Sequence, residues 1–423
     1  MDESGANLDY RAIDSFYDYP RVQGLAEMMN SYGVIHNDPE VVSKIVASQA
    51  HHKKIDGHAP GLQGKDLDTY VAAGVYSDHE CATMEDALAK LQRGQFIMIR
   101  EGTAARNLEA LAPLLTPQYA ERCMFCTDDK HPSDLLEKGH IDYIAREAIN
   151  KYGVDPIIAV KAACHHASRY FLLNNRGAIA PGYLADFAVI DNFKDFNVEM
   201  VFKKGVLYWN NGELRDFEAP KIEEYLDKRA HDTFHVSTLT PDDFRDTRQR
   251  GVLGMVPGEI ITTDNGYADH VDLEKDILKI AVVERHKGTH HIGLGYIQGY
   301  GLKSGAVATS ISHDSHNIIV VGTNSADMAF AANYIVEHHG GIVVVENGTV
   351  KGDVVLEIAG IMSDRPLTEV NDQLEAAKDA AFTLGVSRGI DPFMTLSFMA
   401  LPVIPKLRIT TRGVIDVDTQ QYV

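Results

Sequence analysis

The sequence has few cysteines, no surplus of positive charge and no long apolar run, and each deficit excludes a class of protein. Four cysteines in 423 residues are too few for the disulfide framework of a small secreted domain, so we expect a reduced, cytoplasmic protein. The 40 basic and 60 acidic side chains leave a net charge of −20, which disfavours nucleic acid and anionic membranes as partners. No apolar stretch of about 18 residues predicts a transmembrane helix, and the acidic start is unlike a signal peptide.

What the sequence contains is typical of a globular protein. Hydrophobic residues make up 45% and charged residues 24%, and the length predicts two or three domains. Changes of pattern suggest four parts. Residues 1–175 alternate strands and helices, residues 176–220 are rich in strands and turns, residues 221–233 form a charged linker, and residues 234–423 mix strands and helices as a separate α+β domain.

The first part has the rhythm of a parallel sheet. Its five apolar runs begin 21 to 31 residues apart, and a βα unit of an eight-stranded barrel takes about 31 residues. Such alternation favours a parallel sheet, open or closed. The expected strands are Val22–Met28, Lys53–His58, Gly74–Ser77, Gln95–Arg100 and Arg122–Thr127. The expected helices are Pro39–Ala50, Leu67–Ala73, Thr83–Leu91, Ala104–Leu115, Pro132–Leu136, Asp142–Tyr152 and Asp155–Arg169.

The last part mixes the two periodicities without regular alternation, which is typical of an α+β domain. The expected strands include Leu278–Val283, Ala306–Ser310, Asn317–Val321, Gly341–Glu346 and Val354–Ile358. The expected helices are Asn324–His338 and Leu367–Thr383.

Four of the apolar runs in the first part lead into side chains that bind metal ions. These residues are Glu27, His58, His79 and Asp128. Active sites of parallel barrels lie at the carboxyl ends of the strands, so we expect the four side chains to converge. Imidazole and carboxylate together suit Zn²⁺, Fe²⁺ or Mn²⁺ rather than Ca²⁺. The pattern therefore predicts a metal site that activates water as a nucleophile.

Each of these residues, taken singly, also suits a structural role. A lone histidine at a strand end is more often a hydrogen-bonded core residue, Glu27 could cap a following helix, and the Asp128–Asp129 pair could begin one. The coincidence of four ligand types at successive strand ends favours the metal site.

Several motifs together identify a family. They include Asp56-Gly-His-Ala-Pro-Gly-Leu, Ala73-Gly-Val-Tyr-Ser-Asp-His-Glu-Cys, Thr127-Asp-Asp-Lys-His-Pro, Gly177-Ala-Ile-Ala-Pro-Gly-Tyr-Leu-Ala-Asp and Ser310-Ile-Ser-His-Asp-Ser-His-Asn. These segments closely resemble the adenine deaminase family of the amidohydrolase superfamily, and the resemblance covers essentially the whole chain. It implies hydrolysis of adenine to hypoxanthine and ammonia in purine salvage, at a binuclear Mn²⁺ or Fe²⁺ centre, by a homo-oligomer.

The resemblance also implies a fold. Residues 1–175 would form strands four to eight of a TIM-type (β/α)8 barrel, and residues 176–220 would form part of a β-sandwich. After the linker, residues 234–423 would form the C-terminal α+β domain typical of adenine deaminases.

Site residues follow from the same resemblance. Glu27 matches a bridging carboxylate, His58 and His79 match metal ligands, and Asp128 matches the aspartate that binds metal and shuttles protons. Asp129 is an alternative to Asp128, because neighbouring positions are not separable in the sequence. Glu80 is either a catalytic partner of a ring nitrogen or a carboxylate at a helix start.

Further residues are substrate-binding candidates. Arg100 and Glu101 end a strand and either contact the substrate or brace the neighbouring aspartate. In the C-terminal part, His313 and His316 either close the pocket or satisfy backbone groups of a turn.

The sequence departs from the family pattern near its start. The match begins just after the third barrel strand, and the sequence has no His-x-His pair, the motif that holds the more buried metal in the family. One metal position is therefore expected to be incomplete. The alternatives are a fragment of a longer protein, a partner chain that supplies the missing part, an inactive remnant that serves only assembly, or an amidohydrolase acting on another purine.

Overall fold

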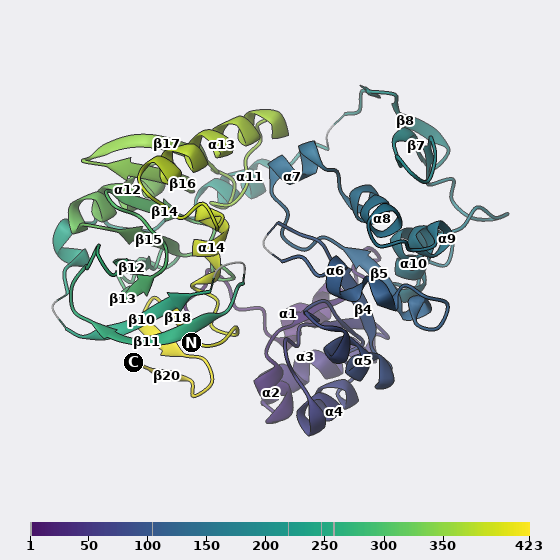
Figure 1. Cartoon of the computed structure of the whole chain (residues 1–423), viewed down its shortest axis with the longest axis horizontal. Helices are drawn as coiled ribbons and strands as arrows, with labels where there is room; N and C mark the ends of the chain where they lie inside the picture. Colours follow the sequence, from purple (N-terminus) through teal and green to yellow (C-terminus); the bar gives the residue numbers. More distant parts are fainter. Residues whose placement is uncertain (1, 104, 219, 247, 257–258) are drawn as a thin grey trace. The chain divides into compact units, whose positions relative to one another are not determined.

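The computed structural model describes residues 2–103, 105–218, 220–246, 248–256 and 259–423. It has mixed α/β content and divides into two compact units (Figure 1). We call Leu8–Ala219 the parallel-strand unit, and Met1–Asn7 with Pro220–Val423 the sheet unit. Ala104, where one expected helix begins, lies outside the described residues.

Strands form at four of the five expected places in the parallel-strand unit, and the third, expected over Gly74–Ser77, is a two-residue strand that begins at Ser77. Strand β1 (Gly24–Met28) pairs in parallel with β2 (Lys54–Gly57). A second parallel sheet has the order β3 (Ser77–Asp78), β4 (Phe96–Arg100) and β5 (Cys123–Cys126). Within each of these sheets the carboxyl ends of the strands therefore lie at one edge.

Helices follow the strands, and the clearest helix start is marked by capping residues in the sequence. Helix α3 (Pro39–Ala50) begins where the Asp38 carboxylate accepts hydrogen bonds from two backbone N–H groups and proline occupies the first turn. Helices α4 (Gly64–Ala72) and α5 (Met84–Gln92) also lie where expected. The remaining helices are α1 (Tyr10–Phe16), α2 (Ser31–Ile35), α6 (Leu108–Leu111), α7 (Pro132–Glu137), α8 (Ile141–Asn150), α9 (Pro156–Val160) and α10 (His166–Tyr170).

Two expected helices differ in detail. The stretch expected as one helix over Asp155–Arg169 is α9 and α10 joined by a π-helical turn at Lys161–His165. The helix expected up to Leu115 is a single α turn, α6, followed by a 3-10 turn at Ala112–Leu114 that contains Pro113. Proline lacks an N–H and cannot continue the hydrogen-bond ladder of a helix interior.

The strand-rich stretch 176–220 contains a four-stranded antiparallel sheet. Its strands are β6 (Phe187–Ile190), β7 (Val198–Lys203), β8 (Val206–Asn210) and β9 (Glu213–Leu214), paired in chain order. The charged stretch 221–233, expected as a linker, contains helix α11 (Glu224–His231), in which no residue is buried.

The sheet unit is built on eight strands in the order β11-β10-β13-β12-β15-β14-β16-β17. Their bounds are β10 (Arg250–Met255), β11 (Thr262–Ala268), β12 (Ile277–Val283), β13 (Ile292–Gln298), β14 (Ala306–Thr309), β15 (Ile318–Gly322), β16 (Gly341–Glu346) and β17 (Thr349–Val355). Every pairing is antiparallel except β10 with β13.

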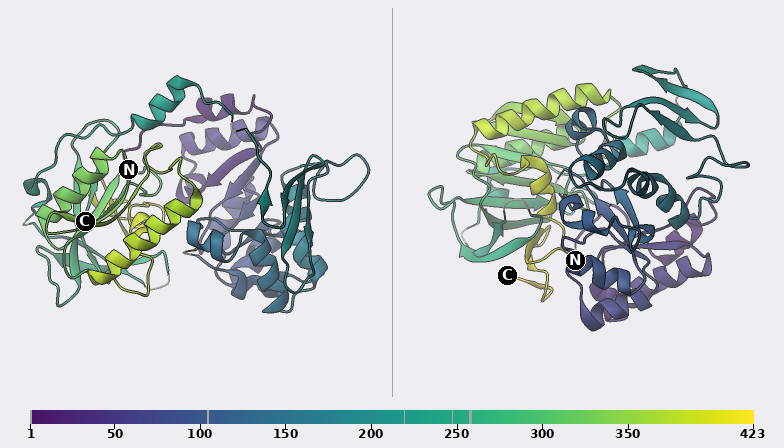
Figure 2. Two further views of the ribbon diagram at one scale, coloured as in Figure 1. Left: turned by 90° about the horizontal axis from the view of Figure 1, so that it is seen from above. Right: turned by 45° about the vertical axis from the view of Figure 1, so that its right-hand side comes forward.

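Both faces of this sheet are covered (Figures 1 and 2). Alternate residues of β15 join different cores: Ile319 packs in the cluster that includes helix α13 (Leu367–Thr383), and Val320 packs in the cluster that includes helix α12 (Ser325–Glu337). Helix α14 (Pro392–Phe398) and a small sheet of β18 (Leu407–Thr410), β19 (Gly413–Asp416) and β20 (Gln421–Tyr422) complete the unit.

The first residues of the chain pack with the sheet unit, although the sequence pattern groups them with 1–175. The Glu3 carboxylate accepts a hydrogen bond from Thr411 Oγ1 at 2.8 Å and lies 3.0 Å from His291 Nδ1. The Glu3 carbonyl accepts from Asn317 Nδ2 at 2.7 Å. The parallel-strand unit is therefore inserted, in chain order, between two segments of the sheet unit.

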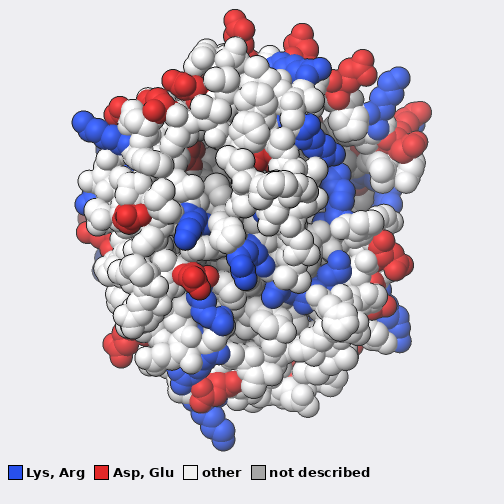
Figure 3. Space-filling model, turned by 90° about the vertical axis from the view of Figure 1, so that its right-hand side faces the viewer, with Lys and Arg blue, Asp and Glu red and all other residues white. Residues whose placement is uncertain are grey.

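The surface charge is uneven. The face shown in Figure 3 carries clusters of Lys and Arg side chains among the acidic ones, despite the net charge of −20. Across the described residues, no helix has both the length and the apolar character needed to cross a bilayer.

Candidate metal centre

Six ionisable side chains converge where the parallel strands end. They come from all five strands or the residues that follow them: Glu27 in β1, His58 after β2, His79 and Glu80 after β3, Arg100 at the end of β4 and Asp128 after β5. Parallel pairing places strand ends at one edge, which brings together residues up to about 100 positions apart.

The first group in this cluster is Glu27, His58 and His79, whose ligand atoms all lie within 4.8 Å of one another. His79 Nε2 is 3.0 Å from Glu27 Oε2, and His58 Nδ1 is 3.9 Å from Glu27 Oε1. The two imidazole rings meet edge to face, with centroids 5.5 Å apart.

His58 shows that this group fits a metal ion. Its side chain is 4% exposed, and both ring nitrogens are without a hydrogen-bond partner among the described residues. A buried polar group without a partner is costly and rare in folded proteins. A divalent ion bound by imidazole and carboxylate would satisfy it, and this ligand set suits Mn²⁺, Fe²⁺ or Zn²⁺.

A second group, formed by His79, Glu80 and Asp128, also has its ligand atoms within 4.8 Å of one another. Glu80 Oε1 is 3.3 Å from His79 Nε2 and 3.5 Å from His58 Nδ1. His79 therefore belongs to both groups, and Glu80 lies between the two histidines.

Arg100 ties the carboxylates of this cluster together. Its guanidinium donates to both oxygens of Glu80, to Asp128 Oδ2 at 2.6 Å and to Asn107 Oδ1 at 3.3 Å. Bidentate hydrogen bonding of this kind fixes the orientation of the carboxylate as well as the position of its charge. Of the two roles predicted for Arg100, the geometry supports bracing Asp128.

The electrostatics show a cluster that attracts positive charge. Burial opposes protonation of His79, but hydrogen bonds and charge from Glu27 and Glu80 raise its pKa to about 10. Burial disfavours the ionised form of Glu80, yet His79 and Arg100 hold its pKa well below the usual value. Where carboxylates stabilise an imidazolium so strongly, they can stabilise a metal cation in its place.

Two neighbouring candidates, Glu101 and Asp129, are outside both of these ligand groups. Glu101 Oε2 accepts a hydrogen bond from the Leu108 N–H at 3.2 Å, at the start of α6, and burial raises the pKa of this carboxyl. The Asp129 carbonyl accepts from the Thr103 N–H at 2.9 Å. It is Asp128, and not Asp129, whose carboxylate belongs to the metal-ligand groups.

The last two candidates, His313 and His316, lie in the sheet unit. Their rings meet edge to face at 5.8 Å, and His313 stacks on Phe398 at 4.8 Å. Burial lowers the pKa of His316 to about 4, so this imidazole is neutral at physiological pH.

Sequence reasoning missed two residues directly behind the cluster, Asp78 and Lys90. Asp78 precedes His79 and is completely buried, and Lys90 Nζ donates to Asp78 Oδ2 at 3.0 Å. A signal was present: Lys90 follows Asp86 by four residues and Ala87 by three, so it lies on the buried side of α5.

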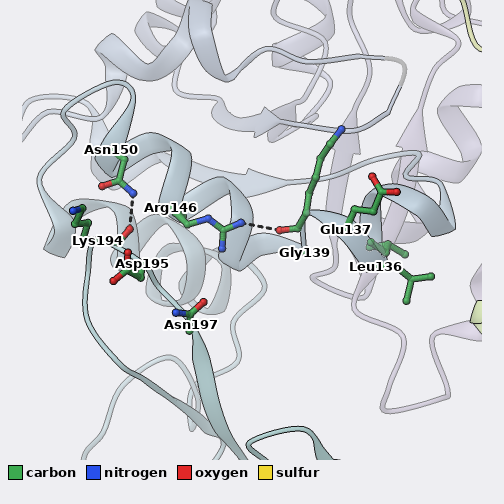
Figure 4. Close-up of a pocket in the computed structure, with 10 residues that line it drawn as sticks. Leu136, Glu137, Gly139, Arg146, Asn150, Lys194, Asp195 and Asn197 are labelled. Atoms are coloured by element: carbon green, nitrogen blue, oxygen red, sulfur yellow. Dashed lines mark hydrogen bonds between the residues drawn. The ribbon is translucent and has the colours of Figure 1, made fainter.

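A separate groove of about 650 Å³ lies between α7, α8 and residues 194–197 of the same unit (Figure 4). Two of its polar side chains donate to main-chain carbonyls of the groove itself. Arg146 donates to the Lys138 carbonyl at 2.8 Å, and Asn150 donates to the Lys194 carbonyl at 2.6 Å. The histidine cluster is therefore a better candidate for the active site than this groove.

Comparison with known proteins points the same way. Residues 21–208 match the amidohydrolase family, and residues 259–421 match the adenine deaminase C-terminal domain. The adenine deaminase of Desulfatibacillum aliphaticivorans is 44% identical over 431 residues, which covers 100% of this chain and 75% of that protein. The adenine deaminase of Dehalococcoides mccartyi is 42% identical over 432 residues, covering 99% and 74%.

Solved structures give a weaker likeness. A β-aspartyl dipeptidase from Fervidobacterium islandicum is 18% identical, with a TM-score of 0.40 over 49% of this chain and 61% of that one. A 5-methylcytosine deaminase from Klebsiella pneumoniae is 14% identical, with a TM-score of 0.34 over 51% of this chain and 60% of that one.

Proposed function

Because this chain belongs to the adenine deaminase family, we propose that it hydrolyses adenine to hypoxanthine and ammonia. The observation that carries the proposal within the structure is His58, a buried imidazole with no hydrogen-bond partner among the described residues, beside Glu27 and His79. A hydrolytic amidohydrolase needs such a ligand set at the ends of parallel strands.

In this proposal Glu27, His58 and His79 hold a divalent ion, Mn²⁺ or Fe²⁺, and Asp128 and Glu80 lie beside it. The bound ion supplies a Lewis acid that lowers the pKa of water toward neutrality. The family centre is binuclear, and the sequence has no His-x-His pair. Glu27, His58 and His79 are therefore the proposed ligands of one metal position, and His79, Glu80 and Asp128 offer part of a second.

The protein's own residues handle the protons. Attack of water at C6 of adenine forms a C–O bond, and Asp128 accepts a proton from that water and passes it to the departing amine at N6. The second water proton ends on ring nitrogen N1, next to Glu80, as the C6–N6 bond breaks and the C6 carbonyl forms. Arg100, which donates to both carboxylates, keeps the two proton carriers at a fixed separation.

The proposal extends to the setting of the reaction. The substrates are adenine and water, and we place the protein in the cytoplasm as a homo-oligomer. The reduced state of four cysteines, at least two of them buried, fits a reducing compartment.

The test is turnover of adenine by the purified 423-residue chain with added Mn²⁺, followed by detection of hypoxanthine and ammonia. Asp128→Asn is expected to abolish most turnover, because the amide cannot accept the proton. Asp129→Asn is the matched control, one position along, and should retain turnover. Equal losses in both variants would contradict the role of Asp128.

Two other results would redirect the assignment. Release of ammonia from another aminopurine but not from adenine would identify a different amidohydrolase. A folded chain that binds Mn²⁺ without turning over any purine would show that the chain, by itself, is not catalytic.

A further inference from the structure

We propose that the buried pair Lys90–Asp78 is a positioning device that holds the metal-binding residues after β2 and β3 in register. The inference rests on the proposed metal centre, which it deepens by assigning two residues that do not touch the metal themselves. In this arrangement Asp78 and Lys90 are positioning residues, and the ligands they position are His58 and His79.

Lys90 is fully engaged. Its side chain is 0% exposed, and the ammonium donates to the Ala59 carbonyl at 2.8 Å and to the carboxylates of Asp78 and Asp86 at 3.0 Å each. An ammonium has three N–H donors, so these three oxygens use its whole capacity and fix its position.

Asp78 joins the two loops. One carboxylate oxygen accepts from the Ala59 N–H at 2.7 Å, and the other accepts from the Glu80 N–H at 3.0 Å. Ala59 follows His58 and Glu80 follows His79 in the sequence. A single carboxylate therefore holds the residue after each of the two histidine ligands.

Ala59 is held at both of its backbone groups. Its N–H donates to Asp78 and its carbonyl accepts from Lys90. The first bond holds the peptide plane between His58 and Ala59, and the second holds the plane between Ala59 and Pro60. Together they fix the backbone next to His58 and constrain the direction in which the imidazole projects. The His58 ring itself has no hydrogen-bond partner among the described residues, so its orientation depends on its backbone. That backbone is held by these bonds and by the bond from the His58 N–H to Tyr70 Oη at 3.0 Å.

The acidic residues around Lys90 could be mistaken for a second metal site. Asp78, Cys81 and Asp86 are all buried, and their ligand atoms lie within 4.8 Å of one another. Lys90 Nζ lies among them, 3.6 Å from Cys81 Sγ and 3.0 Å from each carboxylate. The ammonium already supplies the positive charge there, so the cluster is a charged support and not an ion site.

A charged support is not needed for stability. Buried ion pairs are often matched or exceeded in stability by well-packed apolar groups, because desolvation offsets the attraction. What the pair provides is directional hydrogen bonding to two loops from different strands. Groups that orient metal ligands from behind typically change metal affinity 10- to 100-fold when removed.

The test is Lys90→Met, which keeps the side-chain length and removes the charge and the donors. We expect Mn²⁺ affinity of the folded chain, measured by electron paramagnetic resonance titration, to fall about 10- to 100-fold. Hydrogen exchange should speed up at the backbone N–H groups of Ala59 and Glu80.

The matched control is Lys279→Met in the sheet unit. Lys279 is also a buried lysine, 9% exposed, and its ammonium donates to the Phe244 carbonyl at 2.7 Å. Removing it should lower thermal stability but leave Mn²⁺ affinity and the exchange of Ala59 and Glu80 unchanged. An effect of general destabilisation would appear in both variants.

The outcomes separate the two proposals. If the unmodified chain binds no Mn²⁺, the proposed metal centre fails. If the unmodified chain binds Mn²⁺ and Lys90→Met binds it equally well, with unchanged exchange at Ala59 and Glu80, the positioning role is wrong.

Two variants guard against a Lys90→Met chain that does not fold. Lys90→Gln is one atom shorter and has two N–H donors in place of three, so it cannot make all three bonds of Lys90 and should also lose affinity. Asp86→Asn alters one partner and keeps the link from Lys90 to Asp78, so it should bind Mn²⁺ normally. Normal binding by Lys90→Gln would overturn the inference.

Discussion

The two units treat their buried cations differently. In the parallel-strand unit, Lys90 and Arg100 are paired with carboxylates. In the sheet unit, Lys279 donates to the Phe244 carbonyl at 2.7 Å, and Arg408 donates to the main-chain carbonyl of Ile260 at 2.6 Å. Both arrangements supply oxygen acceptors, although Arg408 Nε has no hydrogen-bond partner among the described residues. Only the first arrangement gathers opposite charges in one place.

The pKa values move in opposite directions as a result. Burial opposes the charge on Lys90 and Arg100, but the neighbouring carboxylates outweigh it and raise both pKa values. Burial lowers the pKa of Lys279, and it lowers that of Arg408 to about 9. Buried cations in both units hold loops through carbonyl oxygens, but only those of the parallel-strand unit are also paired with carboxylates, next to the candidate metal centre.

The apolar cores differ in the same sense. The sheet unit buries continuous apolar clusters on both faces of one eight-stranded sheet. The parallel-strand unit has two separate apolar clusters, one that includes residues of β4 and β5 and one that includes residues of β1 and β2. Stability of the sheet unit should therefore depend on packing, and function of the parallel-strand unit should depend on charge.

The largest expected effect comes from neutralising Glu80, which lies between His79 and Arg100. Glu80→Gln should lower adenine turnover about 10²- to 10⁴-fold, because a proton carrier next to the substrate is lost. Steady-state kinetics with saturating Mn²⁺ would measure it. The control is Glu284→Gln in the sheet unit, where a carboxylate that is 1% exposed accepts from backbone N–H groups. Similar losses of turnover in both variants would break the comparison.

A packing change in the sheet unit should lower stability without changing metal binding. Ile319 is 0% exposed in β15, and Ile319→Ala should lower the free energy of unfolding by about 2–5 kcal/mol through a cavity. Denaturant unfolding would measure this loss, and Mn²⁺ affinity should not change. Ile179, 92% exposed, provides the control, since Ile179→Ala should leave stability unaltered.

Stability of the sheet unit should also fall in mild acid because of His316. Burial lowers the pKa of this imidazole to about 4, and the groups facing it are His313, Asp314, Arg285 and His286. The unfolded chain takes up a proton near pH 6.5 and the folded chain does not. Stability is therefore retained above pH 6.5 and lost as the pH falls toward 4, by up to about 3 kcal/mol.

The check is a series of unfolding curves between pH 7 and 4 for two variants. His316 and His339 both have a positive φ, 52° and 56°, a conformation that asparagine tolerates. His316→Asn should flatten the pH dependence, and His339→Asn, at an exposed position, should leave it as in the unmodified chain. An unchanged slope in His316→Asn would place the acid sensitivity elsewhere.

The smallest effect concerns the helix that carries Lys90. Thr83 Oγ1 accepts from the Asp86 N–H at 3.2 Å and caps α5. Thr83→Ala should cost about 1 kcal/mol of stability and leave Mn²⁺ affinity close to normal, because Lys90 keeps its partners. The control is Thr69→Ala on the exposed side of α4, which removes no cap. A large loss of affinity in Thr83→Ala would mean that the helix start itself positions the ligands.

Much of the fold was predictable where local signals are strong. Helix α3 lies where expected because Asp38 and Pro39 define its start, and α13 lies where expected because its apolar residues repeat along one face. The five parallel strands were predictable from apolar runs at regular spacing.

Other elements depend on contacts that no local pattern shows. Strand β13 was not among the expected strands, because Gly293 and Gly295 dilute its apolar pattern. A Cβ on Gly293 would lie 1.8 Å from the Thr410 carbonyl oxygen, so the glycine is there to let β18 approach. The reason for the glycine lies more than 100 residues away.

The residues of the candidate site were likewise predictable only where the signal is local. Candidate ligands at strand ends could be predicted from the sequence, because residue type and strand position are both local properties. These candidates are Glu27, His58, His79 and Asp128. The residues that hold these ligands in place could not be predicted, because their contacts join side chains from different strands and helices.

The sequence by itself thus determined the family, the candidate ligand residues and most of the elements, since these follow from motifs, periodicity and capping. Only the tertiary structure decided that Arg100 bridges Glu80 and Asp128, that Glu101 accepts a hydrogen bond from the first N–H of α6, and that Lys90 pairs with Asp78 beside the histidines. The physical reason is that a buried charge has no preferred partner in the sequence. The partner is selected by which carboxylate the packed strands and helices bring within hydrogen-bond distance.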